Sequence, residues 1–297
     1  EMQLNPLPKL LKRNFERWGE KEVAFRDKDY GLWNEYTWKD VYENVKYFSL
    51  GLISLGLKPG ERAAIIGDNE PQWYWASFAI QAARGITVAL FTDAIPDEIQ
   101  YIVEHSDSRF IIARDQEQVD KVLQIKDELP LVKKVIYWDP KGVWNYGDPI
   151  LMNFNEVIEL GRKYGELHPG LFESNIEQGN GTDIAVICYT SGTTGLPKGS
   201  MMTHISFIKE GANVPQIDKW GSNEQYVSFL PPAWLAEQAF GLASSLVTGT
   251  EVNFPEDTDT VQENIREIGA QILFWGPRNW ESVNRLIHAK MVDTTTF

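Results

Sequence analysis

One stretch near the middle of the chain limits the fold more than any other. An apolar run at 183–188 is typical of a short buried strand. The segment Tyr189–Gly199 follows at once and combines four Ser or Thr hydroxyls with three glycines, a proline and a lysine. A helix-like pattern begins after it, at Thr203 or His204. This succession of strand, glycine-rich turn and helix predicts a loop that holds a polyphosphate.

The chemistry of the loop residues supports that prediction. Glycine lets the backbone approach phosphate oxygens and present its N–H groups. Hydroxyls donate hydrogen bonds or ligate a magnesium ion, and lysine adds a mobile positive charge. The loop is not of the Walker A type, in which Gly-Lys precedes Ser or Thr, because Lys198 comes before Gly199. The simpler alternative is a surface loop of Ser, Thr and Gly without a ligand.

Strand-like and helix-like patterns alternate on both sides of the loop. The runs 63–66, 86–90 and 110–112 predict strands, and the segments 71–83 and 96–105 predict helices. Strands that alternate with helices imply βαβ units and parallel sheets with helices on both faces. We therefore expect an α/β fold with two doubly wound, mostly parallel sheet subdomains packed together.

The alternation breaks in the stretch 151–182, which ends in a polar segment. We therefore assign the first α/β subdomain to 1–150, a connecting segment to 151–182, and the second subdomain, with the loop, to 183–297. Within the second subdomain, 271–275 is expected to be a strand, followed by a last helix.

Several single residues carry specific expectations. Thr37 is expected to cap a helix, with Asp40 at the capping-box position. Because Trp73–Trp75 are adjacent, they cannot all face one way on a helix, and we expect them mostly in the core. The single cysteine, Cys188, is interpreted as a small core residue and not as a nucleophile.

The bulk composition narrows the range of partners. The net charge is −14, from 42 acidic and 28 basic residues, which argues against nucleic acid or an anionic membrane as a general partner. No apolar run approaches the roughly 20 residues of a membrane span. The first residues lack the layout of a signal peptide, so a cytoplasmic protein is expected. A peripheral membrane contact and a homodimer are left open.

The loop sequence YTSGTTGLPKG, at 189–199, resembles at every position the signature loop of the adenylate-forming (AMP-binding) superfamily. This superfamily includes acyl-CoA synthetases, luciferases and peptide-synthetase adenylation domains. The resemblance extends upstream to LGLKPGER at 55–62 and DNEPQW at 68–73, and downstream to MTH at 202–204. It covers nearly the whole chain.

Two further segments resemble the long-chain fatty acyl-CoA synthetase branch. LPPAWLAEQ at 230–238 is similar to the LPLAHxFE motif, and GPRNWE at 276–281 is similar to VPRxWE. Trp234 occupies the position of the family histidine, which lines the passage between the nucleotide and acyl pockets. The resemblance thus implies that Trp234 gates or narrows an acyl tunnel, with a place in the core as the alternative. Glu237 is expected to bind substrate or to be structural.

The resemblance implies an AMP-forming acid–thiol ligase. A fatty acid is activated with ATP and Mg²⁺ through an acyl-adenylate, and coenzyme A then receives the acyl group. Thr190 and Lys198 are the implied catalytic residues, and Thr190 is the implied metal contact. The implied contacts to the nucleotide phosphates are Thr190, Ser191, Gly192, Thr193, Thr194, Gly195 and Lys198.

Other expectations concern residues and motifs outside the loop. His204 is expected either to cap its own helix or to approach the nucleotide, and Arg278 to form a salt bridge at a helix start. The YGxTE motif and other later elements of the family have no counterpart, so we expect a fragment that is inactive alone. The alternatives are an aryl or short-chain acid ligase, a non-catalytic module, and an unrelated phosphate-binding protein.

Overall fold

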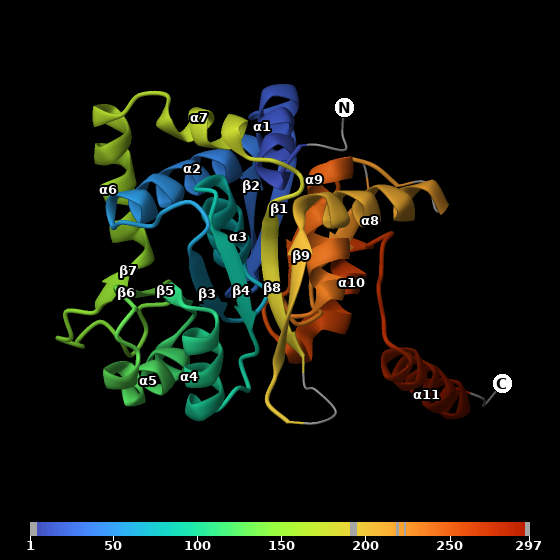
Figure 1. The fold of residues 1–297 in the computed structure, drawn as a ribbon. Helices are drawn as coiled ribbons and strands as arrows, with labels where there is room; N and C mark the ends of the chain where they lie inside the picture. The colour runs from blue at the N-terminus through green and yellow to red at the C-terminus, as the bar shows by residue number, and fades with distance from the viewer. Residues whose placement is uncertain (1–4, 191–194, 218–219, 223, 295–297) are drawn as a thin grey trace.

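The computed structural model describes residues 5–190, 195–217, 220–222 and 224–294. Within these residues the strands form two sheets, a larger and a smaller one (Figure 1). In sheet order, the larger consists of β7 (Leu151–Asn153), β6 (Lys134–Tyr137), β5 (Ser108–Ala113), β3 (Arg62–Ile66), β4 (Ile86–Leu90), β8 (Ile184–Thr190) and β9 (Lys198–Thr203). The smaller consists of β10 (Gln225–Val227), β11 (Glu251–Phe254), β1 (Val23–Asp29) and β2 (Leu32–Thr37).

Neighbouring strands of the larger sheet are parallel, except for the antiparallel pair β8 and β9. Strand β3 shows why this sheet is covered on both faces. Its residues Ala63 and Ile65 belong to one buried cluster, and Ala64 and Ile66 belong to another. A continuous apolar run is typical of a parallel strand buried on both sides. The α/β fold expected from the sequence is confirmed.

Helices fill the space around and between the sheets. Helices α4 (Pro96–His105) and α5 (Gln116–Gln124) pack on the Ala64 face of the larger sheet. Helix α3 (Pro71–Ala82) contacts both sheets, and α2 (Trp38–Ser54) packs against α3 and the smaller sheet. The remaining α-helices are α1 (Leu7–Trp18), α6 (Phe154–Leu167), α7 (Leu171–Gln178), α8 (His204–Ile217), α9 (Ser244–Thr248), α10 (Val261–Ile268) and α11 (Pro277–Thr294). A π-helix, Glu237–Ala243, precedes α9, and 3₁₀ turns cover Lys126–Glu128 and Thr258–Thr260.

Each of the two sheets is built from strands of both halves of the chain. Strand β11 pairs in parallel with β1, where Phe25 lies opposite Val252. Strand β8 pairs in parallel with β4, where Val88 lies opposite Ile187. Each sheet therefore contains strands from both sides of the segment 151–182. The two sheets therefore do not correspond to the expected subdomains 1–150 and 183–297, because strands from both ranges are hydrogen-bonded neighbours in each sheet.

Several local expectations are confirmed. The Thr37 N–H donates to Oδ2 of Asp40 at 2.8 Å, and the Asp40 N–H donates to the Thr37 hydroxyl at 3.2 Å, which completes the capping box of α2. Trp73–Trp75 are all buried, because α3 is enclosed by neighbouring elements on every side. Cys188 is buried in β8, and burial raises the pKa of its thiol to about 12.

Other elements differ from the sequence expectations. Strand β9 has few residues with high β propensity and forms because the loop returns the chain antiparallel along β8. Helix α7 lies in the polar segment and buries only Phe172 and Ile176. The segment 271–275 is not a strand and makes only one bridge, between Tyr226 and Ile272. Its Phe274 stacks on Phe240 instead.

The contact between α2 and α6 depends on two glycines. A Cβ on Gly161 would lie 1.7 Å from the carbonyl oxygen of Tyr47, and one on Gly51 would lie 2.1 Å from that of Val157. We expect Gly161→Ala to lower the free energy of unfolding by about 1–3 kcal/mol, because the helices must separate. Urea denaturation measures this.

Gly165 of α6 provides the matched control. A Cβ there would meet only Cδ1 of Leu50, at 3.0 Å, and this methyl group can rotate away. Gly165→Ala is therefore expected to be neutral or slightly stabilising, since alanine favours the helix by about 1 kcal/mol. Equal effects of the two substitutions would contradict the close approach of α2 and α6.

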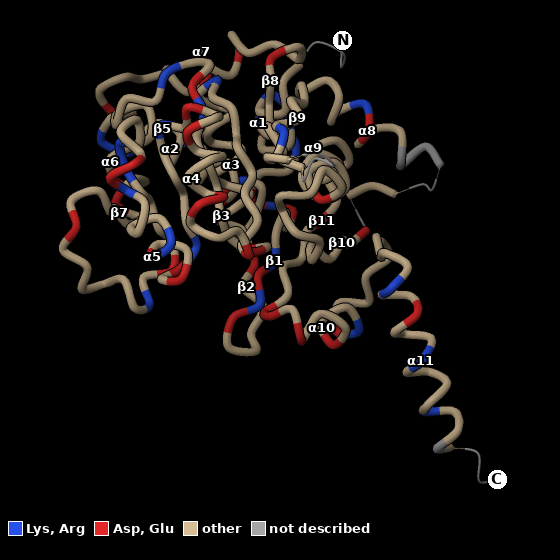
Figure 2. The backbone as a smooth tube through the Cα atoms, turned by 60° about the horizontal axis from the view of Figure 1, so that its bottom comes forward, with Lys and Arg blue, Asp and Glu red and all other residues tan. Residues whose placement is uncertain are grey.

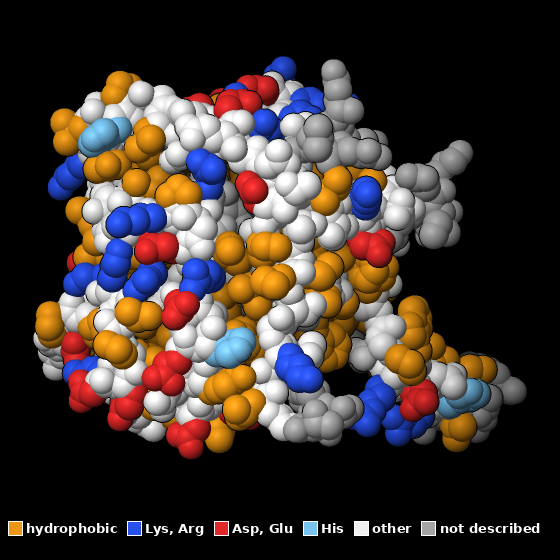
Figure 3. Space-filling model, in the orientation of Figure 1, with side chains coloured by type: hydrophobic (Ala, Val, Ile, Leu, Met, Phe, Trp, Pro, Cys, Tyr) orange, Lys and Arg blue, Asp and Glu red, His pale blue; other side chains and the backbone are white. Residues whose placement is uncertain are grey.

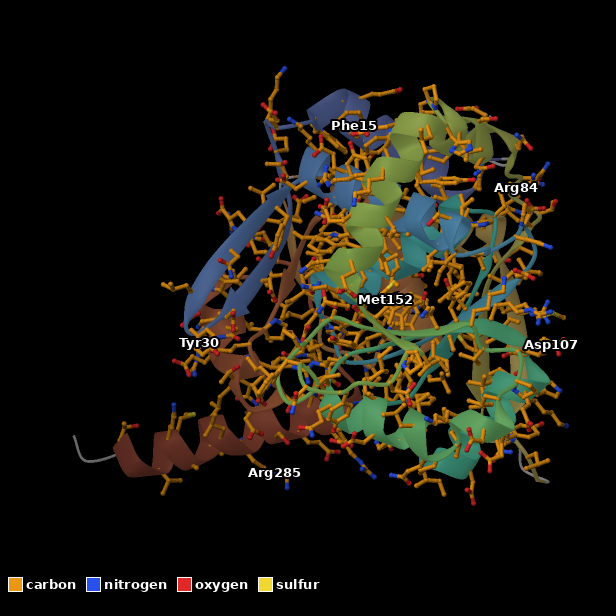
Figure 4. All side chains as sticks on the ribbon, turned by 90° about the vertical axis from the view of Figure 1, so that its left-hand side faces the viewer. Phe15, Tyr30, Arg84, Asp107, Met152 and Arg285 are labelled. Carbon is orange, nitrogen blue, oxygen red and sulfur yellow. The ribbon has the colours of Figure 1, made fainter. Side chains whose placement is uncertain are left out.

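The last helix, α11, extends away from the two sheets (Figures 1 and 2). Its Arg285 points away from the rest of the molecule (Figure 4). Apolar side chains of α11, including Trp280 and Ile287, are half exposed. Across the described part of the chain, no helix combines the length and the apolar character that a membrane crossing requires.

Candidate active site

The hairpin of β8 and β9 places Thr190 beside Lys198. Thr190 is the last residue of β8, Lys198 is the first of β9, and their Cα atoms are partners in the antiparallel ladder. Directly opposed residues of antiparallel strands project to the same face, so the hydroxyl and the ammonium group share one side of the hairpin. Both side chains are exposed. This pair of groups suits a ligand with anionic oxygens.

Two glycines shape the hairpin. Gly195 has a φ of 143°, a conformation that L side chains rarely adopt and glycine adopts without strain. Gly199 is the ladder partner of Tyr189, and a Cβ on it would lie 3.2 Å from Cζ of the tyrosine ring. The absence of a side chain at position 199 therefore lets the Tyr189 ring pack against β9.

Four of the expected phosphate contacts, Ser191, Gly192, Thr193 and Thr194, lie outside the described residues. Their roles stay predictions. The described ends of the loop, Thr190 and Gly195–Lys198, determine where the loop leaves and rejoins the sheet.

A cavity of about 650 Å³ opens beside the hairpin. It lies at the carboxyl ends of the parallel strands β4 and β8, the edge of an α/β sheet at which ligands usually bind. Figure 3 shows hydrophobic side chains gathered over β8 and β9 on this side of the molecule. The cavity is lined by Ala89, Phe91, Asp93, Ala94, Glu98, Ile102, Cys188, Tyr189, Thr190, Pro197, Ala233, Trp234, Leu235 and Ala236.

Trp234 lines this cavity together with Thr190 and Pro197, the residue before Lys198. Its side chain is 47% exposed, so it is not a core residue. The backbone N–H of Trp234 donates to the carbonyl oxygen of Pro231 at 2.9 Å, so the backbone forms a tight turn at Trp234. The structure thus brings Trp234 and the described ends of the loop around one cavity.

Two amide side chains hold the segment that carries Trp234. Nδ2 of Asn69 donates to the carbonyl oxygen of Leu230 at 2.8 Å and to the hydroxyl of Ser228 at 2.9 Å. Nε2 of Gln238 donates to the carbonyl oxygen of Pro232 at 2.6 Å. The backbone on the amino-terminal side of Trp234 is therefore held by one residue just before α3, Asn69, and by one residue of the π-helix, Gln238.

Glu237 does not line the cavity. Its carboxylate is buried at the start of the π-helix and accepts hydrogen bonds from the hydroxyls of Tyr74 at 2.6 Å, Ser228 at 2.5 Å and Tyr226 at 2.5 Å. Burial raises the pKa of this carboxyl to about 7, and the three hydrogen bonds oppose that rise. A Cβ on Gly241 would lie 2.4 Å from Oε1 of Glu237. Glu237 thus joins α3, β10 and the π-helix.

His204 differs from both of its expected roles. It is buried at the start of α8, and its Nδ1 accepts the N–H of Leu7, the first residue of α1, at 3.3 Å. Burial lowers the pKa of the imidazole to about 4, so the ring is neutral near pH 7. His204 therefore caps α1 instead of its own helix. Arg278 lies exposed near the start of α11.

The sequence interpretation missed residues that act through hydrogen bonds between distant segments. Asn69 lies in a segment that carries the family resemblance, but nothing local indicates that it reaches Leu230. Tyr101 of α4 donates to the carbonyl oxygen of Pro197 at 3.1 Å, and no local pattern predicts this contact.

The sequence model of the AMP-binding enzyme family matches residues 11–295. The chain therefore belongs to the AMP-binding enzyme family. This membership agrees with the loop at the end of β8 and with the cavity beside it.

Curated relatives are similar over most of the chain. The rat (Rattus norvegicus) protein named long-chain-fatty-acid–CoA ligase ACSBG1 is 27% identical over 278 residues, which are 88% of this chain and 36% of that protein. The human (Homo sapiens) protein named long-chain-fatty-acid–CoA ligase ACSBG2 is 25% identical over 287 residues, which are 95% of this chain and 42% of that protein. The chain thus spans well under half the length of these relatives.

Solved structures confirm the fold. A crystal structure of the anthranilate CoA ligase AuaEII with anthranoyl-AMP has a TM-score of 0.73 at 19% identity and covers 88% of this chain and 46% of that one. A luciferase-like enzyme from the mealworm Zophobas morio has a TM-score of 0.75 at 17% identity and covers 92% of this chain and 60% of that one.

Proposed function

We propose that a protein containing this chain activates a long-chain fatty acid with ATP and then transfers the acyl group to coenzyme A. The observation that carries the proposal is the position of Thr190 and Lys198 as cross-strand partners at an apolar cavity of about 650 Å³. The cavity falls within the range of about 300–1,000 Å³ that is common for small-molecule sites.

In the first step, a carboxylate oxygen of the fatty acid attacks the α-phosphorus of ATP. The bond from that phosphorus to the bridging oxygen breaks, and pyrophosphate leaves with the electron pair. The departing group gathers negative charge, which the Lys198 ammonium and the loop donors would stabilise. In the second step, the thiolate of coenzyme A attacks the acyl carbon and AMP leaves.

The described residues suit a magnesium ion in their donor chemistry. Mg²⁺ prefers oxygen ligands and binds together with substrate phosphates, and Thr190 presents an exposed hydroxyl at the end of β8. When bound, the ion would withdraw charge from the phosphate oxygens. Thr190 is the residue that we assign to this contact.

The apolar lining supports an aliphatic acyl group in the cavity. Alanines at 89, 94, 233 and 236 leave room between larger side chains such as Phe91 and Trp234. Transfer of a hydrocarbon chain into such a site is favourable by about 0.8 kcal/mol for each buried CH₂ group. We assign Glu237 no direct contact with the substrate. It would affect substrate binding only by supporting the segment that carries Trp234.

A chain-length series tests the proposed substrate. The protein is incubated with ATP, Mg²⁺, coenzyme A and one of a series of acids, from acetate and benzoate to saturated C18, and the acyl-CoA product is measured. We expect kcat/KM to rise with chain length. A preference for benzoate or acetate would support an aryl or short-chain acid ligase and contradict the long-chain proposal.

Trp234→Ala is expected to raise the KM for long-chain fatty acids about tenfold, because a large apolar side chain is lost from the cavity lining. The KM for ATP is expected to stay unchanged, since the loop is intact. Steady-state kinetics at varied fatty acid concentration and at varied ATP concentration give the two KM values separately. Trp144→Ala is the control, because that indole is 76% exposed and does not line the cavity. Equal effects at both sites would exclude Trp234 from the acyl path.

A cytoplasmic location, a peripheral membrane contact and a homodimer are further proposals for the protein. The peripheral membrane contact is suggested by the apolar nature of the proposed substrate class. Inactivity of this chain when it is expressed alone is a proposal as well.

A further inference from the structure

Helix α4 contacts both stems of the phosphate-binding loop. The Tyr101 hydroxyl donates to the carbonyl oxygen of Pro197 at 3.1 Å, and Pro197 immediately precedes Lys198. Nδ1 of His105 lies 2.7 Å from the hydroxyl of Tyr189, which immediately precedes Thr190. One helix therefore holds the chain just before each of the two proposed catalytic residues.

Tyr101 and His105 form a single unit. They are four residues apart on α4 and so lie on the same face of the helix. Their rings stack, with centroids 5.5 Å apart and planes inclined by 25°. The His105 ring also meets the Tyr189 ring edge-on, at 5.8 Å and 83°. A displacement of Tyr101 would therefore disturb the contact at the other stem.

The carboxyl end of α4 is itself fixed to the larger sheet. Arg62, the first residue of β3, donates through Nη2 to Oδ2 of Asp107 at 2.7 Å and through Nε to the carbonyl oxygen of Ser106. Asp107 has a φ of 49° and turns the chain from α4 into β5 at the periphery of the molecule (Figure 4). The helix is thus anchored next to the residue that holds Tyr189.

We propose that Tyr101 is a positioning residue for the phosphate-binding loop, supported by His105. The proposal rests on the proposed function, because it assigns Tyr101 to the loop that binds the nucleotide phosphates. The hydrogen bond to Pro197 fixes the direction in which the backbone enters Lys198. Tyr101 acts through this carbonyl group and keeps the ammonium group of Lys198 opposite the Thr190 hydroxyl.

Tyr101→Phe tests the proposal, because it keeps the stacked ring and removes only the hydroxyl. We expect amide hydrogen exchange in peptides covering 195–203 to become about two- to tenfold faster, the effect of losing one hydrogen bond. The KM for ATP is expected to rise by a similar factor, with the KM for the fatty acid unchanged. Tyr146→Phe is the matched control, because its hydroxyl bonds Asp120 at 2.7 Å, outside the loop contacts.

Unchanged exchange in 195–203 relative to the wild type and to Tyr146→Phe overturns the proposal, whatever the activity. Faster exchange across the whole chain also overturns it, since that result indicates a general loss of stability. Exchange does not require turnover. Faster exchange limited to the loop, in a protein that forms no adenylate, would therefore support the anchoring by Tyr101 and contradict the proposed function.

Discussion

Replacement of Lys198 by alanine is expected to slow acyl-adenylate formation by about 10²–10³ and to leave the fold intact. In the proposed reaction the ammonium group would lie where negative charge develops on the departing pyrophosphate, and a preorganised donor of this kind has an effect of that size. Lys198 is exposed at the start of β9, so its removal exposes no core. Rapid quenching of the reaction without coenzyme A measures the rate of adenylate formation.

Lys209 of α8 provides the control, since Lys209→Ala removes the same charge from another exposed position. This variant is expected to react at the rate of the wild type. A Lys198→Ala protein that forms adenylate within about threefold of the wild-type rate would be incompatible with the transition-state effect expected of such a donor.

Glu237→Ala is expected to lower the free energy of unfolding by about 3–5 kcal/mol. The substitution removes the acceptor of three buried hydroxyls, those of Tyr74, Tyr226 and Ser228, and each unpaired donor costs about 1–3 kcal/mol. Relief from the burial of a carboxylate offsets part of this loss. Urea denaturation of the variant and the wild type gives the difference.

Glu159 of α6 is the matched control, because its carboxylate is 64% exposed and its ion pair with Arg162 lies at the surface. Glu159→Ala is expected to change the free energy of unfolding by less than about 1 kcal/mol. Equal losses for Glu237→Ala and Glu159→Ala would show that the buried network contributes nothing beyond a surface carboxylate.

The raised pKa of Glu237 also predicts a dependence of stability on pH. Burial moves the pKa of this carboxyl from 4.5 to about 7, so between these values the unfolded chain releases a proton that the folded protein keeps. The stability that this group contributes is therefore fully present below pH 4.5 and is lost as pH rises through about 7. Glu237→Gln is expected to flatten this part of the curve, because an amide does not titrate. An unchanged slope in the variant would assign it to other groups.

The loop and the general fold could be predicted because their signals are local. A buried strand followed by glycines, hydroxyls and Lys198 stands within 183–199, and the helix start at Thr37 shows its own capping residues. The place of Trp234 beside the loop was predicted only by resemblance, since about 40 residues separate the two in the sequence.

The rest depends on contacts between distant segments, which a single sequence does not display. Strands β8 and β11 of the second half of the chain pair with β4 and β1 of the first half. No residue pattern in the sequence indicates these pairings. The role of Glu237 depends on two tyrosines and a serine that come from α3 and from the β10 region. A polar residue inside an apolar segment indicates burial, but it does not identify its partners.

The most direct test of the account is the exchange of labelled pyrophosphate into ATP by the protein that contains this chain. Exchange requires reversible attack of a carboxylate on the α-phosphorus and does not require coenzyme A. We expect exchange with a long-chain fatty acid, none without an acid, and a loss of about 10²–10³ in Lys198→Ala. Exchange that is independent of the acid, or that is undiminished in Lys198→Ala, would contradict the account.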